Sequence, residues 1–135
     1  MTQLRFMFDA NIVSDLVKNP AGRIAQRIRQ IGEAGLGVSI IVAAELRYGC
    51  LAPGSPALTR KVEGVLARLI VATFDSPADV EYAKIRMALK RRGLPIGPND
   101  LLIAAHAISL NVPLVTRNVA EFRRVPGLSI ENWLQ

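Results

Sequence analysis

The sequence predicts an α/β domain in which helices cover both faces of a mostly parallel sheet. Short apolar runs rich in β-branched and aromatic residues alternate with longer segments of helical periodicity along the chain. Connections of this kind between parallel strands are right-handed crossovers. The chain has 135 residues, 50% of them hydrophobic, and it contains neither an internal repeat nor a dividing linker. A single domain spanning residues 1–135 is therefore expected.

The N-terminal part predicts one strand followed by two helices. Residues 4–8 form an apolar and aromatic run that ends abruptly at Asp9, which is typical of a strand leading into a polar turn. A short helix follows, and either Asn11 or Ser14 is expected to cap it. An Asn-Pro pair ends that helix, and residues 21–33 predict another with isoleucines at helical spacing.

Four more strands and four more helices are predicted in the remainder of the chain. The expected strands are residues 38–41, 70–74, 113–116 and 128–130. The expected helices are residues 42–50, 57–68, 77–92 and 98–110. Ser76 is expected to cap the helix that begins at Pro77. That helix is expected to turn Val80, Ala83 and Met87 toward the core.

Composition and charge narrow the class of protein. Charged residues make up only 21% of the chain, which excludes a disordered tail. The formal net charge is +6, so the protein attracts polyanions such as nucleic acid. Cys50 is the single cysteine and has no internal disulfide partner, which favours a reducing compartment, most simply the cytoplasm. The apolar stretches fall well short of the roughly 18 residues of a membrane helix, so no membrane association is expected.

Four polar side chains are predicted to meet at the carboxyl edge of the sheet. Asp9 follows the first strand, and Asn118 lies just beyond the fourth. Glu45 lies in the first turn of the helix that follows the second strand. Asp100 begins a helix that runs antiparallel to the strands, so its N-terminus returns to the same edge. Because open parallel sheets bind ligands there, we expect three carboxylates and one amide around a common volume.

Clustered carboxylates of this kind need a proton or a cation to neutralise them. All the candidate donors are oxygen atoms, which suits Mg²⁺, or Mn²⁺ in its place, and suits zinc poorly. His106 does not restore a zinc site, because at about 100° per residue it lies roughly 120° around the helix axis from Asp100. We interpret it as a packing or interface residue. A hard cation beside a basic surface indicates phosphodiester chemistry.

Four motifs in series resemble a known family. They are Phe8-Asp9-Ala10-Asn11-Ile12-Val13-Ser14, then Ala43-Ala44-Glu45-Leu46-Arg47-Tyr48-Gly49, then Gly97-Pro98-Asn99-Asp100-Leu101-Leu102-Ile103-Ala104-Ala105-His106-Ala107, then Val115-Thr116-Arg117-Asn118 with Glu121-Phe122 and Val125-Pro126-Gly127-Leu128. In order and spacing they are similar to the PIN-domain toxins of bacterial toxin–antitoxin pairs, the VapC type. The resemblance covers nearly the whole chain. It implies a three-layer α/β/α domain with a five-stranded parallel sheet. It also implies an Mg²⁺-dependent endoribonuclease that arrests growth until a cognate antitoxin neutralises it.

The resemblance assigns roles to the acidic positions. Asp9, Glu45 and Asp100 match the family's metal-site residues and are the expected metal ligands. Asn118 occupies the place where many members have a fourth acid, and we expect it to complete the site as the fourth catalytic residue. Glu121 is an alternative fourth group, although capping or pairing with a nearby arginine is the simpler interpretation.

The resemblance and the positions of nearby polar residues suggest which side chains bind the substrate. Asn11 is expected to orient Asp9 or to contact the phosphate, and Thr116 is expected to support the site from behind. Arg117 is expected to steer phosphate toward the pocket, as are Arg123 and Arg124. RNA is the expected substrate, while the target sequence and the number of metal ions stay open.

A rival interpretation makes the chain a binding module without turnover. In that case a PIN fold acts with its antitoxin on operator DNA, and Asn118 and Ala10 are the departures from the family pattern that favour it. In both interpretations operator DNA is contacted only through the antitoxin. Apolar residues on more than one face of helix 77–92 indicate a surface that is covered in a homodimer or by the antitoxin.

Overall fold

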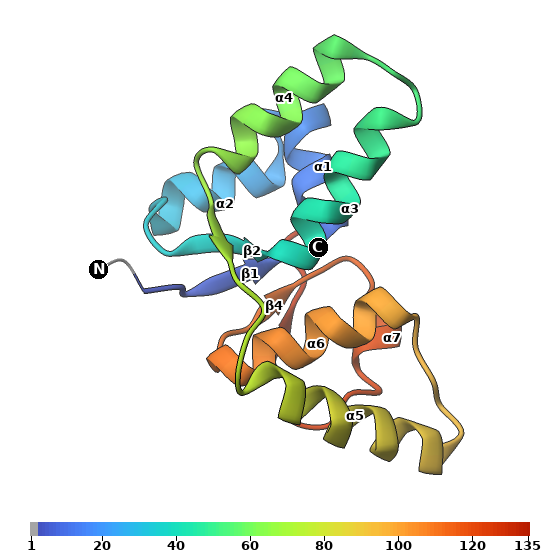
Figure 1. The fold of residues 1–135 in the computed structure, drawn as a ribbon. Helices are drawn as coiled ribbons and strands as arrows, with labels where there is room; N and C mark the ends of the chain where they lie inside the picture. Colours follow the sequence, from blue (N-terminus) through green and yellow to red (C-terminus); the bar gives the residue numbers. More distant parts are fainter. Residues whose placement is uncertain (1–2) are drawn as a thin grey trace.

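The computed structural model describes residues 3–135, and in that range it contains one five-stranded sheet (Figure 1). The strands are β1 (Phe6–Phe8), β2 (Leu36–Ser39), β3 (Ile70–Ala72), β4 (Leu114–Val115) and β5 (Ile130–Glu131). Their order is β3-β2-β1-β4-β5, and every neighbouring pair is parallel. In the central strand, Met7 is paired with Gly37 on one side and with Leu114 on the other. The expectation of five strands in a parallel sheet is confirmed.

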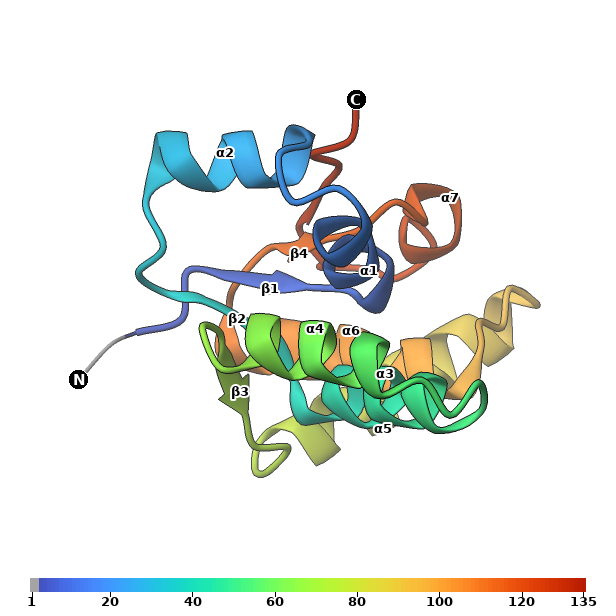
Figure 2. The ribbon, with the colours of Figure 1, turned by 90° about the horizontal axis from the view of Figure 1, so that it is seen from above.

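Helices cover both faces of this sheet. They are α1 (Ala10–Lys18), α2 (Arg23–Ile31), α3 (Ile40–Leu51), α4 (Pro56–Leu66), α5 (Ala78–Arg92), α6 (Pro98–Leu110) and α7 (Val119–Phe122). Figure 1 shows α1 to α4 on one side of the sheet and α5 to α7 on the other, and Figure 2 gives the view from above. The chain first builds outward from β1 to β3 and then crosses to β4, so right-handed connections place the two sets of helices on opposite faces. The result is the three-layer α/β/α architecture.

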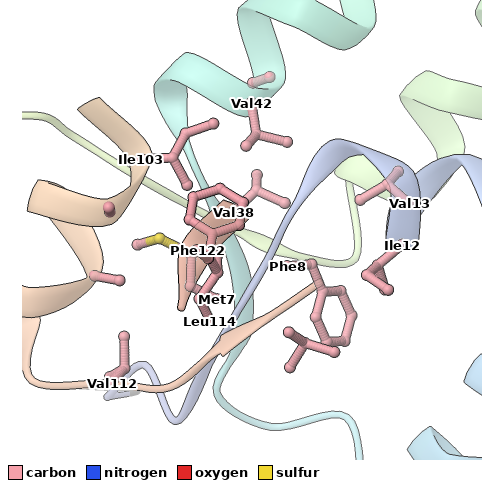
Figure 3. Close-up of a cluster of buried hydrophobic side chains, with 14 of the residues drawn as sticks. Met7, Phe8, Ile12, Val13, Val38, Val42, Ile103, Val112, Leu114 and Phe122 are labelled. Atoms are coloured by element: carbon pink, nitrogen blue, oxygen red, sulfur yellow. The ribbon is translucent and has the colours of Figure 1, made fainter. Parts of the chain in front are cut away.

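The core fills the space between the sheet and the two helical layers (Figure 3). Met7 and Phe8 of β1 are fully buried, as are Val38 of β2 and Leu114 of β4. Phe122 of the short helix α7 is also fully buried and closes the core beside β4. Strands of a parallel sheet that is covered on both faces lose their polar alternation, which is why these segments read as continuous apolar runs.

The start of the first helix differs from the expectation. Asp9 is the cap of α1, and its Oδ1 accepts a hydrogen bond from the backbone N–H of Ala10 at 2.8 Å. Asn11 and Ser14, which were expected to cap the helix, both lie inside it. An aspartate accepts hydrogen bonds from free N–H groups as well as serine or asparagine does. The strand therefore passes into the helix with no intervening turn.

The second strand begins and ends earlier than predicted. It spans Leu36–Ser39 instead of 38–41, because Ser39 Oγ accepts a hydrogen bond from the N–H of Ile41 at 3.1 Å and starts α3 there. Two isoleucines that read as strand are therefore the first helical residues. As a consequence Glu45 lies in the second turn of α3, not in the first.

The bounds of the other predicted elements agree with the structure within a few residues. One predicted cap and one short helix differ from the expectation. Ser76 does not cap α5, which begins at Ala78 with Pro77 in the cap position and no side-chain cap hydrogen bond. Helix α7 was not predicted, because four residues are too short for helical periodicity to be visible. It lies just after β4 and carries Glu121.

The expected orientation of α5 was wrong. Val80 and Met87 are 48% and 46% exposed, and Ala83 is exposed as well. The buried side of the helix carries Ile85 and Leu89, which pack against the core. Both sides of this helix are apolar, so periodicity alone did not determine which side faces α6. Within residues 3–135, no helix combines the length and the apolar composition needed to cross a membrane.

Candidate active site

The strand order reverses between β1 and β4, and the polar residues gather where these two strands end. Asp9 directly follows β1 and is only 5% exposed. Its N–H donates to the carbonyl of Val115 in β4 at 2.9 Å, which fixes its backbone to the neighbouring strand. Burial raises the pKa of the Asp9 carboxyl, although hydrogen bonds from Thr116 and Ala10 oppose that shift.

Two further residues hold the Asp9 carboxylate in place. Thr116 Oγ1 donates to Asp9 Oδ2 at 2.8 Å, and Asn11 Nδ2 donates to the same oxygen at 3.3 Å. Asn11 Oδ1 accepts from the backbone N–H of Arg117 at 3.1 Å. Asn11 and Thr116 therefore link the ends of β1 and β4 and orient Asp9, while the Arg117 side chain is exposed at the rim.

Asp100 and Glu121 lie next to each other, and each changes the pKa of the other. Asp100 lies in the first turn of α6 and is hydrogen-bonded to the carboxyl group of Glu121. Burial, this hydrogen bond and the charges of Glu121, Asp9 and Glu45 raise the pKa of Asp100 to about 8. The hydrogen bond from Asp100 is also the main reason that the pKa of Glu121 is lowered. The protonated form of Asp100 beside an ionised Glu121 is therefore favoured.

Glu121 is held by two more hydrogen bonds. Its Oε1 accepts from the backbone N–H of Gly97 at 3.1 Å, and its Oε2 accepts from Asn118 Nδ2 at 2.6 Å. Asn118 thus orients Glu121 through its amide. Glu121 adds a fourth carboxylate to those of Asp9, Glu45 and Asp100. The spacing of Asn118 and Glu121 matches a helix capping pattern, which hid this function in the sequence.

Glu45 faces the same group of acids from α3. Its Oε2 accepts a hydrogen bond from Asn99 Nδ2 at 3.4 Å, a contact that the sequence did not indicate. Its Oε1 is buried and has no hydrogen-bond partner. Burial is the main reason that the pKa of Glu45 is raised, and the charge of Asp9 adds to the shift. A buried carboxylate oxygen with no partner is costly unless a cation or a ligand group reaches it.

The raised pKa values and the unpartnered oxygen of Glu45 favour a positive charge beside these acids. Burial and mutual repulsion raise the pKa of three of the carboxyl groups, so each gains from a nearby positive charge. Among residues 3–135, no three histidine, cysteine, aspartate or glutamate side chains are arranged so that they could hold a metal ion. The acids therefore converge less tightly than the sequence predicts. An all-oxygen site that leaves room for several water molecules suits Mg²⁺ or Mn²⁺ better than Zn²⁺.

His106 lies outside this acid cluster, in agreement with the expectation. It is 1% exposed, and its Nδ1 is 2.8 Å from Ser39 Oγ. Its ring packs edge to face on Phe74 with centroids 5.2 Å apart. Burial lowers the pKa of His106, so the ring is a neutral packing residue that joins α6 to the start of α3. Cys50 is buried, as expected of a small apolar side chain.

Comparison with known proteins agrees with this architecture. The family model for the PIN domain matches residues 6–128. The tRNA(fMet)-specific endonuclease VapC of Salmonella typhimurium is 37% identical over 131 residues, which cover 96% of this chain and 98% of the relative.

Solved structures lead to the same family. The structure of VapBC2 from Rickettsia felis bound to a DNA fragment from their promoter is 34% identical, with a TM-score of 0.87 and coverage of 96% of this chain and 99% of that one. DNA-bound VapBC from Salmonella typhimurium is 39% identical, with a TM-score of 0.86 and coverage of 97% and 99%. The chain belongs to the PIN-domain family and, within it, to the VapC ribonucleases.

Proposed function

We propose that this chain is the toxin of a toxin–antitoxin pair and that it hydrolyses phosphodiester bonds of RNA at the acid cluster. The observation that carries the proposal is the group of four carboxylates, Asp9, Glu45, Asp100 and Glu121, at the carboxyl edge of β1 and β4. Relatives that align over nearly the whole chain are named as ribonucleases. We propose that it acts in the cytoplasm, where it would meet RNA and a cognate antitoxin.

PIN-domain ribonucleases of the VapC type depend on a divalent metal. We propose Mg²⁺, with Mn²⁺ able to replace it, because every candidate ligand is a carboxylate oxygen. Asp9, Asp100 and Glu45 would hold the ion once Asp100 gives up its proton, and Glu121 would add a fourth negative charge beside them. Such an ion supplies positive charge beside the reacting phosphate and makes water more acidic.

The side chains around the acids prepare the site for this chemistry. Thr116 and Asn11 keep Asp9 in one orientation, and Asn118 does the same for Glu121. Positioned carboxylates avoid the reorganisation that free side chains need in the transition state. We propose that the exposed Arg117 at the rim holds the phosphate of the strand, and that Arg123 assists it.

A cleavage assay with the isolated chain tests the proposed function. Labelled tRNA(fMet) and a pool of other structured RNAs are each incubated with the isolated chain and Mg²⁺ or Mn²⁺. The 5′ ends of the fragments are then mapped. We expect defined fragments, loss of cleavage on addition of a chelator and recovery on re-addition of the metal. Co-purified antitoxin should suppress cleavage. Failure of the antitoxin-free chain to cut any RNA with either metal would favour the binding-module alternative.

A groove between α1, α2 and α4 is the surface we propose for the antitoxin. It has a volume of about 590 Å³ and an apolar floor that includes Leu16, Ile28 and Val65. Lys18 and Arg60 lie on its lining, so a segment with apolar and acidic residues would complement it. The VapBC2 structure from Rickettsia felis and the VapBC structure from Salmonella typhimurium are both bound to DNA. We therefore propose that operator DNA is bound through the antitoxin.

We further propose that the protein is a homodimer that uses the outer side of α3. Ile40, Tyr48 and Leu51 are 43%, 74% and 78% exposed, and at about 100° per residue they form one stripe along the helix. Apart from Glu45 and Arg47 the helix is apolar, and its exposed apolar side chains lie on one side of it. An exposed apolar stripe of this length marks a protein contact.

Changing this stripe should produce monomers. We expect the double variant Tyr48→Glu with Leu51→Glu to halve the molar mass measured by light scattering, because two like charges would be buried without partners. The exposed Arg91→Gln variant serves as the control and should keep the mass of the wild type. An unchanged mass in the double variant would show that α3 is not the interface.

A further inference from the structure

A pocket on the α5 side of α6 is not explained by the acid cluster. It has a volume of about 550 Å³ and lies between the C-terminal half of α5 and the loop that leads to α6. Leu89 and Leu101 form part of its apolar floor, and Tyr82, Arg86 and Lys90 line it from α5. Its lining, taken from residues 3–135, contains no carboxylate. The pocket therefore combines an apolar floor with positive charge.

One wall of this pocket is a fixed pair of an aromatic ring and a guanidinium group. Arg86 Nη1 donates to the Tyr82 hydroxyl at 2.8 Å, and the Arg86 guanidinium lies 5.9 Å from the centre of the Tyr82 ring. Both planes can stack on an unpaired nucleobase, and such stacking tolerates any base. Lys90 lies one helical turn beyond Arg86 and adds a charge suited to phosphate.

The same loop connects this pocket to the acid cluster. Ile96 and Pro98 line the pocket, whereas the N–H of Gly97 between them donates to Glu121 at 3.1 Å. Arg124 Nη1 donates to the carbonyl of Pro95 at 3.1 Å, which holds the loop in place. The two sites are therefore opposite sides of one short segment. An RNA strand whose phosphate lies at the acids can therefore extend across this segment toward the pocket.

We propose that this pocket, here called the α5–α6 pocket, binds an unpaired nucleotide of the RNA next to the phosphate that is cut. Its base stacks on Tyr82 and Arg86, and Lys90 pairs with its phosphate. The inference rests on the proposed ribonuclease function and adds a specificity element to it. A nucleotide in this place favours RNA that is single-stranded beside the cut, such as a loop, because a paired base cannot enter.

The test measures RNA binding separately from cleavage. Binding of a labelled single-stranded RNA is measured by fluorescence anisotropy with protein that carries Asp100→Asn, which prevents cleavage. The measurement is repeated with the double variant that carries both Asp100→Asn and Tyr82→Leu. We expect Tyr82→Leu to weaken binding about tenfold and Tyr82→Phe to leave it nearly unchanged, because stacking needs the ring and not the hydroxyl. In protein that retains Asp100, Tyr82→Leu should raise the KM for RNA cleavage by the same factor and leave kcat unchanged.

A matched pair of charge variants provides a second arm. Lys90→Gln should weaken RNA binding and reduce the slope of log Kd against log salt by about 0.7, as expected when one single-strand phosphate contact is lost. Arg91→Gln removes the same charge from the next position of α5, outside the pocket lining, and should change neither value. Both lysine and arginine are exposed, so these variants should fold.

Three results would overturn the proposal. Equal RNA affinity of the wild type, Tyr82→Leu and Lys90→Gln would show that the pocket does not bind the strand. A fall in kcat without a rise in KM in the Tyr82→Leu variant would show that Tyr82 supports the acid cluster and does not bind the strand. A change in molar mass without a change in RNA affinity would make the pocket an interface between copies of the chain. Lack of cleavage by the wild type with intact, Tyr82-dependent RNA binding would instead contradict the ribonuclease function alone.

Discussion

Asp100→Asn should lower the rate of RNA cleavage at saturating metal by at least about 10²-fold, and Asp9→Asn should do the same. Each change removes a charge from the acid cluster without changing the shape of the side chain. Asp9 is the more buried of the two, and its carboxylate also caps α1. For Asp9 the thermal midpoint must therefore be measured beside the initial rate, so that a loss of folded protein is not counted as a loss of chemistry.

Two further variants make this prediction specific. Asp79→Asn changes an exposed aspartate of α5 and should leave the rate unchanged. Glu121→Gln keeps a side chain that can still interact with Gly97 and Asn118 but removes the fourth negative charge. We expect a loss of about 10–100-fold, as for residues that orient or complete a metal site. Wild-type rates in Asp100→Asn would refute the assignment of the active site.

The same Asp100→Asn change should stabilise the metal-free protein at alkaline pH. The pKa of Asp100 is about 8 in the folded protein and 3.8 in the unfolded chain. Between these values the folded state binds more protons, so the free energy of unfolding falls as the pH rises. Because Asp100 is only partly buried, solvent screens much of this effect. An increase of about 3–6 °C in the thermal midpoint at pH 8.5 is expected, or roughly 1 kcal/mol.

The prediction is checked with the two proteins in chelator at pH 5.5 and pH 8.5. At pH 5.5 the midpoints should be similar, because the protonated carboxyl and the amide both donate to Glu121. Added Mg²⁺ or Mn²⁺ should raise the midpoint of the wild type, more strongly at pH 8.5 because metal competes with the proton on Asp100. It should have little effect on Asp100→Asn. A variant that is less stable than the wild type at pH 8.5 in chelator would contradict the repulsion inferred for these acids.

The layered architecture could be predicted from the sequence because it depends on strong local patterns. Five apolar runs separated by helical segments require a covered parallel sheet, and right-handed connections then restrict how the helices are placed. The positions of Asp9 and Asp100 followed from the same geometry, since both lie where an element meets the carboxyl edge of the sheet.

Elements with weak local patterns were predicted less well. Ser39 starts α3 two residues earlier than its β-branched neighbours suggested, because a side-chain cap outweighs their small preference for strand. Helix α5 is apolar on two sides, and only packing against α6 determines that Ile85 and Leu89 face inward. Local preferences of this size are easily overridden by tertiary contacts.

The fold class could be predicted from the order and spacing of residues along the chain, and the same pattern predicts that Asp9, Glu45 and Asp100 belong to one site. The tertiary structure adds that the Glu121 carboxylate lies beside Asp100 and that Asn118 donates a hydrogen bond to it. The physical reason is that the role of a polar side chain depends on its neighbours in space. Glu121 lies beside Asp100, which is 21 positions away in the chain, and the amide of Asn118 orients it.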